Sequence, residues 1–372
     1  MPDPRDFSAF TIVSYYSLVR GSVRYHAAVR SKRVRFVPII GATVGLTALG
    51  ALVVHFGADA VIRSLVGIGW GGFTAICLIH LALIAVMGIA WWALAPGAPA
   101  WVFIWGRLTR DAGSEVLPLS QMGGTVLGAR AVALAGVSGP VATASTIVDL
   151  TLEFFAKLAY TAVGLVLLVH LRPDLPVALP ITTGIAVAAL VAIAFVVVQR
   201  HGFALFDRLA RALGRSWADR TAAGAASVHT ELGRTYRRKS GLWVGFLLHL
   251  VCWVASALEV WIALRLAGRA LDFTAVLVIE SLLYAIRTVA FAIPNAVGVQ
   301  EGAYIILGGA FGLTPEMALA LSLLKRARDL AIGLPVLGAW QAVEGGRLWR
   351  RLASSVALPV AKAARTWGED RG

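Results

Sequence analysis

The stretch AIPNAVGVQEGAY, residues 292–304, decides the fold, because it sets helix-breaking and polar residues between two strongly apolar stretches. Pro294 and Gly298 favour a turn, while Gln300 and Glu301 add polar groups next to it. Irregular backbone of this kind is tolerated at membrane depth only where protein buries it or where it lines a wet cavity. The meaning of the stretch therefore depends on whether the sequence around it spans a membrane.

The composition indicates a polytopic helical membrane protein. The chain is 58% hydrophobic and 15% charged, with a mean hydropathy of +0.77, whereas a soluble domain carries about 25% charged residues. Several apolar runs are about 20 residues long, enough to cross a ~30 Å hydrocarbon core as helices. The first run starts near Phe36 behind a hydrophilic leader and is followed by others, which is typical of an anchor rather than of a cleaved signal peptide.

Six apolar windows are interpreted as full crossings: 36–56, 72–95, 141–169, 178–198, 242–267 and 316–341. Two further segments, 101–139 and 272–314, are apolar on average but interrupted by Pro, Gly and charges. The predicted fold is therefore an all-α polytopic membrane protein with about six full transmembrane helices and two broken segments.

Lys and Arg in the connections predict the orientation. They are concentrated in the N-terminal segment 1–35, in segment 199–240 and in the tail 346–372. Because cytoplasmic loops carry the excess of Lys and Arg, we expect both termini in the cytoplasm. The transmembrane domain is then 36–345, with 199–240 inserted as a cytoplasmic, basic and amphipathic segment.

With the basic segments all in the cytoplasm, the number of crossings between them requires each broken segment to begin and end on one side of the membrane. Segment 101–139 begins and ends in the cytoplasm, and segment 272–314 begins and ends in the periplasm. We therefore predict two re-entrant broken-helix hairpins that enter from opposite sides, as in an inverted repeat with a midplane substrate site. The alternative is that both segments are ordinary kinked spans.

Charged residues inside the predicted spans have two interpretations. Asp149, Glu153 and Lys157 recur every fourth residue, so they share one face of a helix. They form either a structural ladder of salt bridges or a wall that titrates protons or binds a head group, since charges in spans face a bundle interior or water. Glu280 and Arg287, seven residues apart, allow the same two interpretations.

The first broken segment is rich in polar side chains: Arg107, Arg110, Glu115, Ser120, Gln121 and Arg130. Arginine is suited to gripping phosphate or carboxylate with its planar fork. For Arg107 and Arg110 the alternative is topology alone, because basic residues mark the cytoplasmic side. Arg130 lies in the returning limb, past the Gly123-Gly124 turn, where topology does not explain it.

Two further acids require partners if they are buried. Glu259 has no obvious local partner, so it either pairs with an arginine of another helix or is protonated. Glu301 begins the returning limb of the second hairpin, and we expect it to pair with Arg130 of the opposite hairpin or, failing that, with Arg287.

Metal, nucleotide and nucleic-acid chemistry are not indicated. The histidines lack metal-ligand spacing, no P-loop motif occurs and no Ser-His-Asp arrangement stands out. We expect no catalytic residues, no metal and no cofactor. The net charge of +14 lies largely in cytoplasmic segments that face an anionic leaflet, so the expected partners are membrane lipids, including anionic phospholipids, and not nucleic acid.

Five motifs carry a family resemblance: SEVLPLSQMGG (114–124), GARAVALAGV (128–137), ASTIVDLTLEF (144–154), AFAIPNAVGVQEGAY (290–304) and LLKRARDL (323–330). In this order they resemble the flippase-like membrane family related to the transmembrane region of lysylphosphatidylglycerol synthases, and within it the members associated with hopanoid biosynthesis. The chain departs from the family pattern at Asn295-Ala296-Val297, where such proteins tend to have Gly-Gly-Leu.

The resemblance implies movement of a polar-headed lipid, with a hopanoid as the candidate, across or out of a bacterial inner membrane. It does not imply aminoacyl transfer, because 372 residues leave no room for the soluble synthase domain. Two rivals stay open. One is an integral-membrane enzyme that modifies a lipid head group, with Asp149 or Glu153 as general base. The other is a scaffold that binds lipid-synthesis enzymes through segment 199–240.

The residues that we place along the substrate path are Arg130, Asp149, Glu153, Glu280, Arg287, Pro294, Asn295, Gly298, Gln300 and Glu301. A secondary set comprises Arg107, Arg110, Glu115, Ser120, Gln121, Lys157, Glu259, Lys325, Arg328 and Asp329.

Overall fold

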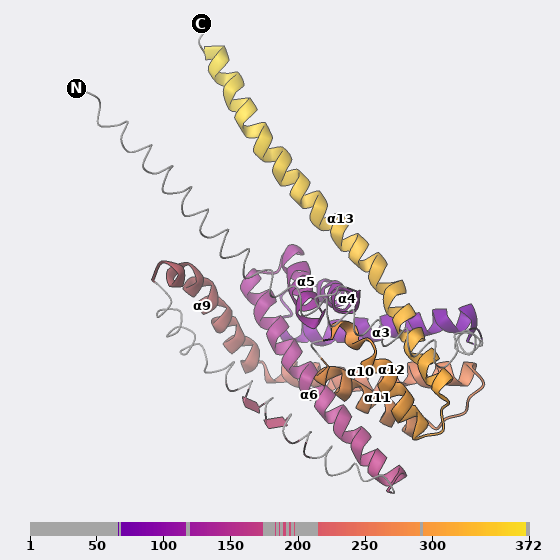
Figure 1. Cartoon of the computed structure of the whole chain (residues 1–372). Coiled ribbons are helices and arrows are strands. Elements are labelled where there is room, and N and C mark those ends of the chain that lie inside the picture. The colour runs from indigo at the N-terminus through magenta and orange to yellow at the C-terminus, as the bar shows by residue number, and fades with distance from the viewer. Residues whose placement is uncertain are drawn as a thin grey trace.

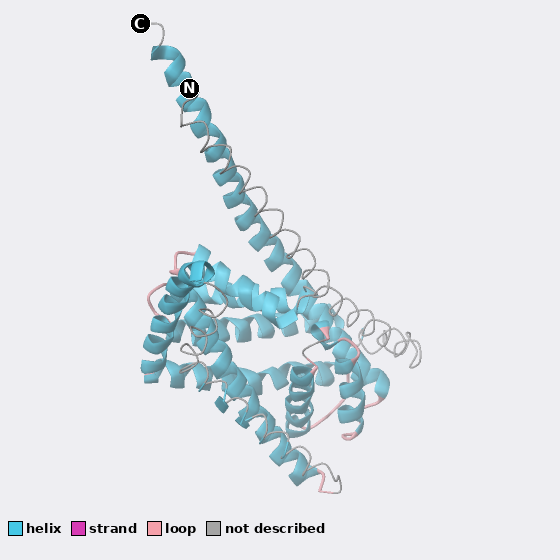
Figure 2. Ribbon diagram, turned by 60° about the vertical axis from the view of Figure 1, so that its left-hand side comes forward, coloured by secondary structure: helices cyan, strands magenta, loops and turns pink. Residues whose placement is uncertain are grey.

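The structure is a computed structural model that describes residues 66, 68–116, 120–173, 215–290 and 293–369, together with isolated positions between 183 and 197. These residues form helices and no strand (Figure 1, Figure 2), so the all-α prediction is confirmed for them. The N-terminal segment 1–35, the window 36–56 and most of the window 178–198 lie outside the described residues.

Three helices among the described residues are long and apolar enough to cross a membrane. They are α3 (Gly69–Leu94), α6 (Gly139–Leu171) and α10 (Lys239–Leu266), and they coincide with three of the predicted windows. The window 316–341 lies within α13 (Pro315–Glu369), a single helix of 55 residues. No helix break separates this window from the predicted tail.

The first broken segment is a helical hairpin of α4 (Ala100–Val116) and α5 (Ser120–Leu134). Glycines let the two helices approach closely, because a Cβ atom at Gly113 would lie 2.9 Å from the Cα atom of Gly124. A Cβ atom at Gly128 would likewise lie 2.7 Å from the Arg110 side chain. Small residues at such contacts are typical of helices that pack within membranes.

The second broken segment also folds back on itself, through α11 (Phe273–Val289), a 3₁₀ turn (Pro294–Ala296) and α12 (Val299–Gly309). Asn295 and Ala296 adopt φ angles of 49° and 45° in this turn. This left-handed conformation suits glycine and is tolerated by asparagine, but alanine is strained in it. The backbone therefore has the form that the family's Gly-Gly pattern predicts, although the chain builds it from other residues.

The two hairpins begin at opposite ends of the bundle. Helices α3 and α10 are antiparallel, since Gly241 packs against the backbone of Ala93 at one end and Gly72 packs against Leu266 at the other. The α4/α5 hairpin follows the end of α3, whereas the α11/α12 hairpin follows the opposite end of α10 (Figure 1). The order of long helix, hairpin and long helix thus occurs twice, in inverted orientation.

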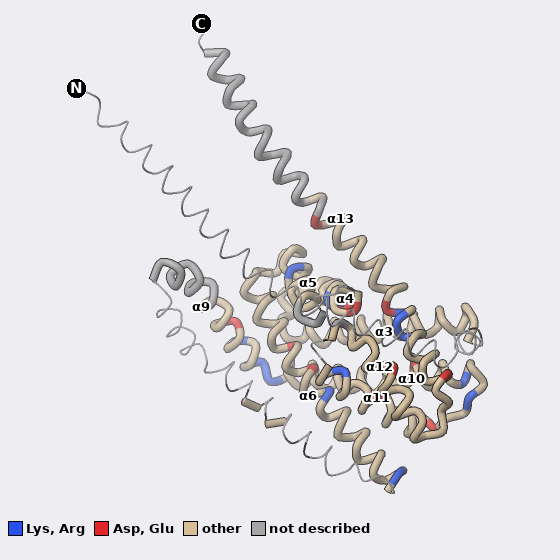
Figure 3. The backbone as a smooth tube through the Cα atoms, viewed as in Figure 1, with Lys and Arg blue, Asp and Glu red and all other residues tan. Residues whose placement is uncertain are grey.

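The described part of the basic segment is helix α9 (Arg215–Arg237), which packs against α6. Its residues Leu232 and Tyr236 contact a core cluster that includes Trp91 and Val148. This cluster lies near the start of α6, at the end of the bundle where the first hairpin begins, and Figure 3 shows the acidic and basic residues on the described part of α9. Helix α9 and the start of the first hairpin thus lie at the same end of the bundle, and the side of the membrane that this end faces stays a prediction.

Candidate functional site

Two arginines of the first hairpin are buried against the charged face of α6. The Arg107 Nη1 atom donates to Glu153 at 2.8 Å, and Arg110 donates to Asp149 at 2.7 Å and also to Glu153. The Lys157 Nζ atom lies 3.0 Å from Glu153. Arg107 and Arg110 are 3% and 4% exposed, so topology alone does not account for them. The three charges of α6 thus extend into a network that crosses to α4.

His249 of α10 completes this network. Its Nε2 atom lies 2.9 Å from Asp149 Oδ1, and both side chains are fully buried. Its Nδ1 atom has no hydrogen-bond partner among the described residues. His249 was not predicted as a site residue, because the spacing of the histidines indicates only that they do not form a metal site. The useful signal is a single polar side chain within a long apolar span.

A second network centres on the motif LLKRARDL of α13, whose cations bind acids on three other helices: Lys325 binds Glu280 of α11 at 2.6 Å, Arg326 binds Glu301 of α12 at 2.7 Å, and Arg328 binds Glu259 of α10. Glu259 also lies 2.9 Å from His80 of α3. Of the two interpretations given for Glu259, the structure shows the pair with an arginine of another helix. Arg326 was absent from the predicted site residues.

Glu301 is held at the start of α12. Its carboxylate accepts hydrogen bonds from the Gly298 main-chain N–H at 2.6 Å, from Ser322 at 2.7 Å and from Arg326. Gln300 donates to the same Ser322 hydroxyl at 2.7 Å. Glu301 is fully buried, as expected. Its bonds, however, join the second hairpin to α13 and not to the first hairpin.

The predicted pair between Glu301 and Arg130 is wrong, and so is the alternative pair with Arg287, which binds Glu115 and Asn295 instead. Arg130 lies on α5, has a side chain that is 51% exposed and binds Glu344 of α13. The prediction failed because it placed the turn of the hairpin at Gly123-Gly124, whereas both glycines lie within α5 (Ser120–Leu134), which carries Arg130 toward its far end, away from the tip.

The tips of the two hairpins meet through Glu115, Arg287 and Asn295. The Arg287 Nη2 atom donates to the Glu115 carboxylate at 3.1 Å and to the Asn295 side-chain oxygen at 2.9 Å. Asn295 in turn donates to the main-chain oxygen of Glu115 at 3.0 Å. The two hairpins thus converge as predicted, but the contact is made by Glu115, Arg287 and Asn295 and not by Arg130 and Glu301. The side chains of Pro294, Ser120 and Gln121 lie outside the described part.

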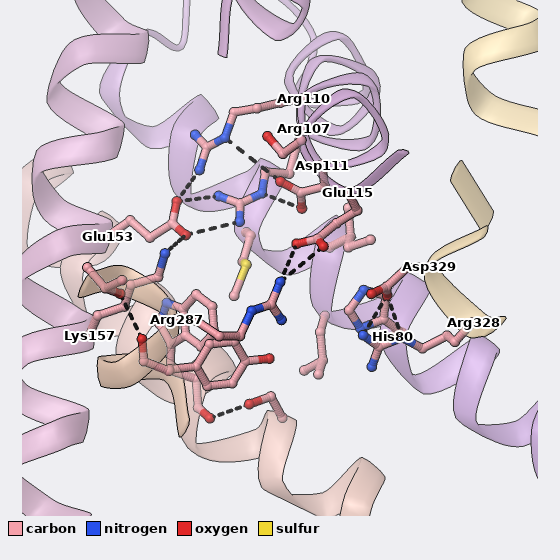
Figure 4. Close-up of a pocket in the computed structure, with 18 of the residues that line it drawn as sticks. His80, Arg107, Arg110, Asp111, Glu115, Glu153, Lys157, Arg287, Arg328 and Asp329 are labelled. Atoms are coloured by element: carbon pink, nitrogen blue, oxygen red, sulfur yellow. Dashed lines mark hydrogen bonds and ion pairs between the residues drawn. The ribbon is translucent and has the colours of Figure 1, made fainter. Parts of the chain in front are cut away.

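A polar cavity of about 110 Å³ lies between the two networks, beside the hairpin tips. Figure 4 shows Arg107, Arg110 and Glu153 on one side of it, Arg328, Asp329 and His80 on the other, and Arg287 with Glu115 between them. Trp253 also lines the cavity, and its buried Nε1–H donor has no partner among the described residues. The cavity therefore offers charges of both signs and an unused donor.

The cavity continues into a second pocket that we call the cationic mouth, with a volume of about 240 Å³. Its lining residues are Arg110, Leu150, Glu153, Phe154, Lys157, Arg287 and Thr288. Beyond it lies an apolar groove of about 570 Å³ between α6, α11 and α12, lined mainly by Phe154, Leu158, Leu282, Ala285, Ile286 and Leu307. Lys157, Tyr284 and Thr288 line both the polar cavity and the groove, so the two spaces adjoin.

The structure brings only part of the predicted site to this cavity. The predicted residues that line it are Arg107, Arg110, Glu115, Glu153, Lys157, Arg287, Arg328 and Asp329. Asp149, Glu259, Glu280 and Lys325 lie behind it in ion pairs, and Asn295, Gly298, Gln300 and Glu301 shape the second hairpin. Within the described residues, no group of three His, Cys, Asp or Glu side chains is placed to hold a metal ion.

The all-α bundle, with three membrane-length helices, two opposed hairpins and a polar cavity next to an apolar groove, defines a multi-pass helical membrane protein. Residues 38–336, well over half of the chain, match the family model described as the lysylphosphatidylglycerol synthase transmembrane region. The chain belongs to this family, as its motifs predicted. Searches among curated proteins and among solved structures find no match.

Proposed function

We propose that this protein moves a polar-headed lipid across or out of the bacterial inner membrane. One observation carries the proposal: a polar, charged cavity and an apolar groove share Lys157, Tyr284 and Thr288 as lining residues. A lipid is the kind of molecule that needs both surfaces at once. Its head group would occupy the cavity while its tail stays in the groove.

The groove has the character of a surface that faces lipid. Ile286 and Val289 are 37% and 81% exposed on α11 beside it, and exposed apolar side chains of this kind mark membrane contact. The head group would therefore cross the bilayer inside protein while the tail remains in hydrocarbon. The family resemblance adds a hopanoid as one candidate for this lipid.

We also propose that the chain moves its lipid without modifying it. Asp149 does not line the cavity, and it accepts bonds from Arg110 and His249. Glu153 accepts bonds from Arg107 and Arg110. A general base must present a free lone pair to its substrate, and arginine pairing works against that role. We further propose that both termini lie in the cytoplasm. The basic segments would then bind the anionic lipids of the cytoplasmic leaflet.

Transport can be tested in vesicles of phosphatidylethanolamine and phosphatidylglycerol that contain a trace of tail-labelled fluorescent lipid. Dithionite bleaches the outer leaflet only, so an active protein should raise the bleached fraction from the outer-leaflet share to nearly all of the label. Thr288→Trp, which fills the junction of cavity and groove, should block this movement. Val251→Trp is the control, because Val251 is 60% exposed on α10 and does not line the groove.

Two results would count against the proposal. Bleaching that stays at the outer-leaflet share with folded protein present would argue against lipid movement. Chemical conversion of the labelled lipid, seen by chromatography of the same vesicles, would favour the enzyme instead.

A further inference from the structure

The cationic mouth has an excess of positive charge at the point where the groove meets the polar cavity. Arg110, Lys157 and Arg287 line it, and Glu153 is the carboxylate that lines it with them. Elsewhere in the cavity, charges of the two signs are more nearly balanced, since Asp111, Glu115 and Asp329 also contribute there. The lining of the mouth therefore holds three cations and one carboxylate next to the tail-binding surface, while Asp149 and Glu115 pair with Arg110 and Arg287 from outside that lining.

The cations of the mouth retain donors for a ligand. All the hydrogen bonds of Arg287 in the described structure use its Nη2 atom, which leaves Nε and Nη1 without a partner there. The Lys157 ammonium has three donors. It lies 3.0 Å from the Glu153 carboxylate and 4.6 Å from the centre of the Trp253 ring. Arg287 and Lys157 are 13% and 23% exposed as side chains. Arg287 and Lys157 can thus each donate a hydrogen bond to a ligand while keeping their present ion pairs.

We propose that the cationic mouth binds the phosphate of a phospholipid substrate, with Lys157 and Arg287 as the groups that select it. The inference rests on the proposed function and narrows its substrate class. In a phospholipid the phosphate is the charged group nearest the tails, which places it at the mouth when the tails lie in the groove. Charge-assisted bonds from Lys and Arg to phosphate are strong and short.

A lipid with an uncharged hydroxylated head would gain less at this site. Its hydroxyl groups would accept hydrogen bonds from Lys157 and Arg287, but these bonds would be weaker than the charge-assisted bonds that a phosphate accepts. The mouth therefore discriminates between lipids of equal tail length by the charge of the first polar group. A phospholipid has a charged group at this position, whereas a neutral hopanoid has none.

The test compares two probes with the same tails, dioctanoyl phosphatidic acid and dioctanoylglycerol, titrated against the purified full chain in detergent and detected by native mass spectrometry. We expect the phosphatidic acid to bind about tenfold or more tightly, which is the effect of one good charged contact. Lys157→Gln and Arg287→Gln should each remove most of that difference. Arg130→Gln, which changes the charge of the chain equally but lies outside the mouth, should leave it intact.

Equal binding of the two probes would overturn the phosphate assignment while leaving lipid transport in place. A loss of selectivity in Arg130→Gln as large as in Lys157→Gln would also overturn it, because overall charge would then explain the preference. If neither probe binds, the proposed function fails as well. Should Arg287→Gln not fold, Lys157→Gln carries the test, since Lys157 does not hold the hairpin tips together.

Discussion

The side-chain amide of Asn295 donates a hydrogen bond of 3.0 Å to the main-chain oxygen of Glu115, and so fastens the turn of the second hairpin to the last turn of α4. Arg287 reinforces this contact from α11 by binding both residues. The two halves of the molecule therefore meet at their hairpin tips, beside the polar cavity. In the proposed transport the two halves would move against each other, so the tip contact would have to slide or separate.

The tip contact predicts a cross-link. Glu115→Cys combined with Asn295→Cys, in a chain without its two native cysteines, should form a disulfide or react with a short bifunctional reagent, because the residues touch. Lipid movement should fall when the link forms and recover on reduction. The pair Glu115→Cys and Thr314→Cys is the control, since Thr314 lies beyond the far end of α12. Equal cross-linking of both pairs would contradict the arrangement.

Ala296→Gly should stabilise the protein. Its φ of 45° costs alanine about 1–2 kcal/mol, and glycine relieves this at an entropic cost of about 0.5–1 kcal/mol. The expected gain is a fraction of a kcal/mol to about 1 kcal/mol, seen as a higher midpoint of thermal unfolding in detergent. Ala303→Gly, in the helical interior of α12, should lower the midpoint instead. A lower midpoint for Ala296→Gly would show that the turn differs from the one described.

The opposite entry of the two hairpins can be tested by labelling single cysteines from each side of the membrane. Gly268→Cys and Thr314→Cys flank the second hairpin and should react with a membrane-impermeant maleimide from the periplasm. Gly97→Cys and Gly136→Cys flank the first hairpin and should react only when the cytoplasm is opened. Labelling of position 314 from the cytoplasmic side alone would rule out the second re-entrant hairpin.

Glu301→Gln should unfold the protein more readily, contrary to a purely functional role for this acid. The carboxylate caps α12 and binds Arg326 in the protein interior, and breaking a buried pair costs about 3–5 kcal/mol. Arg130→Gln should change stability by less than about 1 kcal/mol, because its pair with Glu344 is half exposed. Thermal unfolding of the two variants gives the comparison. Similar midpoints would remove the structural role assigned to Glu301.

Much of the fold could be predicted from the sequence because hydropathy and Pro and Gly positions act locally. The windows at α3, α6 and α10 and the two hairpins follow from those signals. Ion-pair partners could not be predicted in the same way. Arg130 or Arg287 was expected to bind Glu301, whereas Arg326 binds it, because the partner depends on which face of α13 points toward α12. Lys325, Arg326 and Arg328 lie within four residues of α13, and their spacing does not indicate which helix supplies the acid that each one binds.

The relation between the halves was hidden by a reversal of charge. Arg107 lies seven residues into α4 and faces Asp149, which lies ten residues into α6, at 3.9 Å. Glu280 lies seven residues into α11 and binds Lys325, which lies ten residues into α13, at 2.6 Å. The same positions thus hold a buried ion pair in each half with the signs exchanged. A comparison of residue types finds no similarity there, whereas a comparison of positions does.

The charged face of α6 should divide into two parts with different mutant behaviour. Asp149 is fully buried between His249 and Arg110, so Asp149→Asn leaves a buried guanidinium underpaired and should cost several kcal/mol of stability. Lys157 is partly exposed in the mouth and pairs with Glu153, which keeps its two arginine partners when the lysine is lost. Lys157→Gln should therefore keep its folded yield and its thermal midpoint close to those of the parent. In the vesicle assay it should slow the movement of phosphatidylglycerol by about tenfold, the effect of one charged contact. If Lys157→Gln loses folded protein as Asp149→Asn does, the whole face is a structural ladder and the mouth is not a binding site.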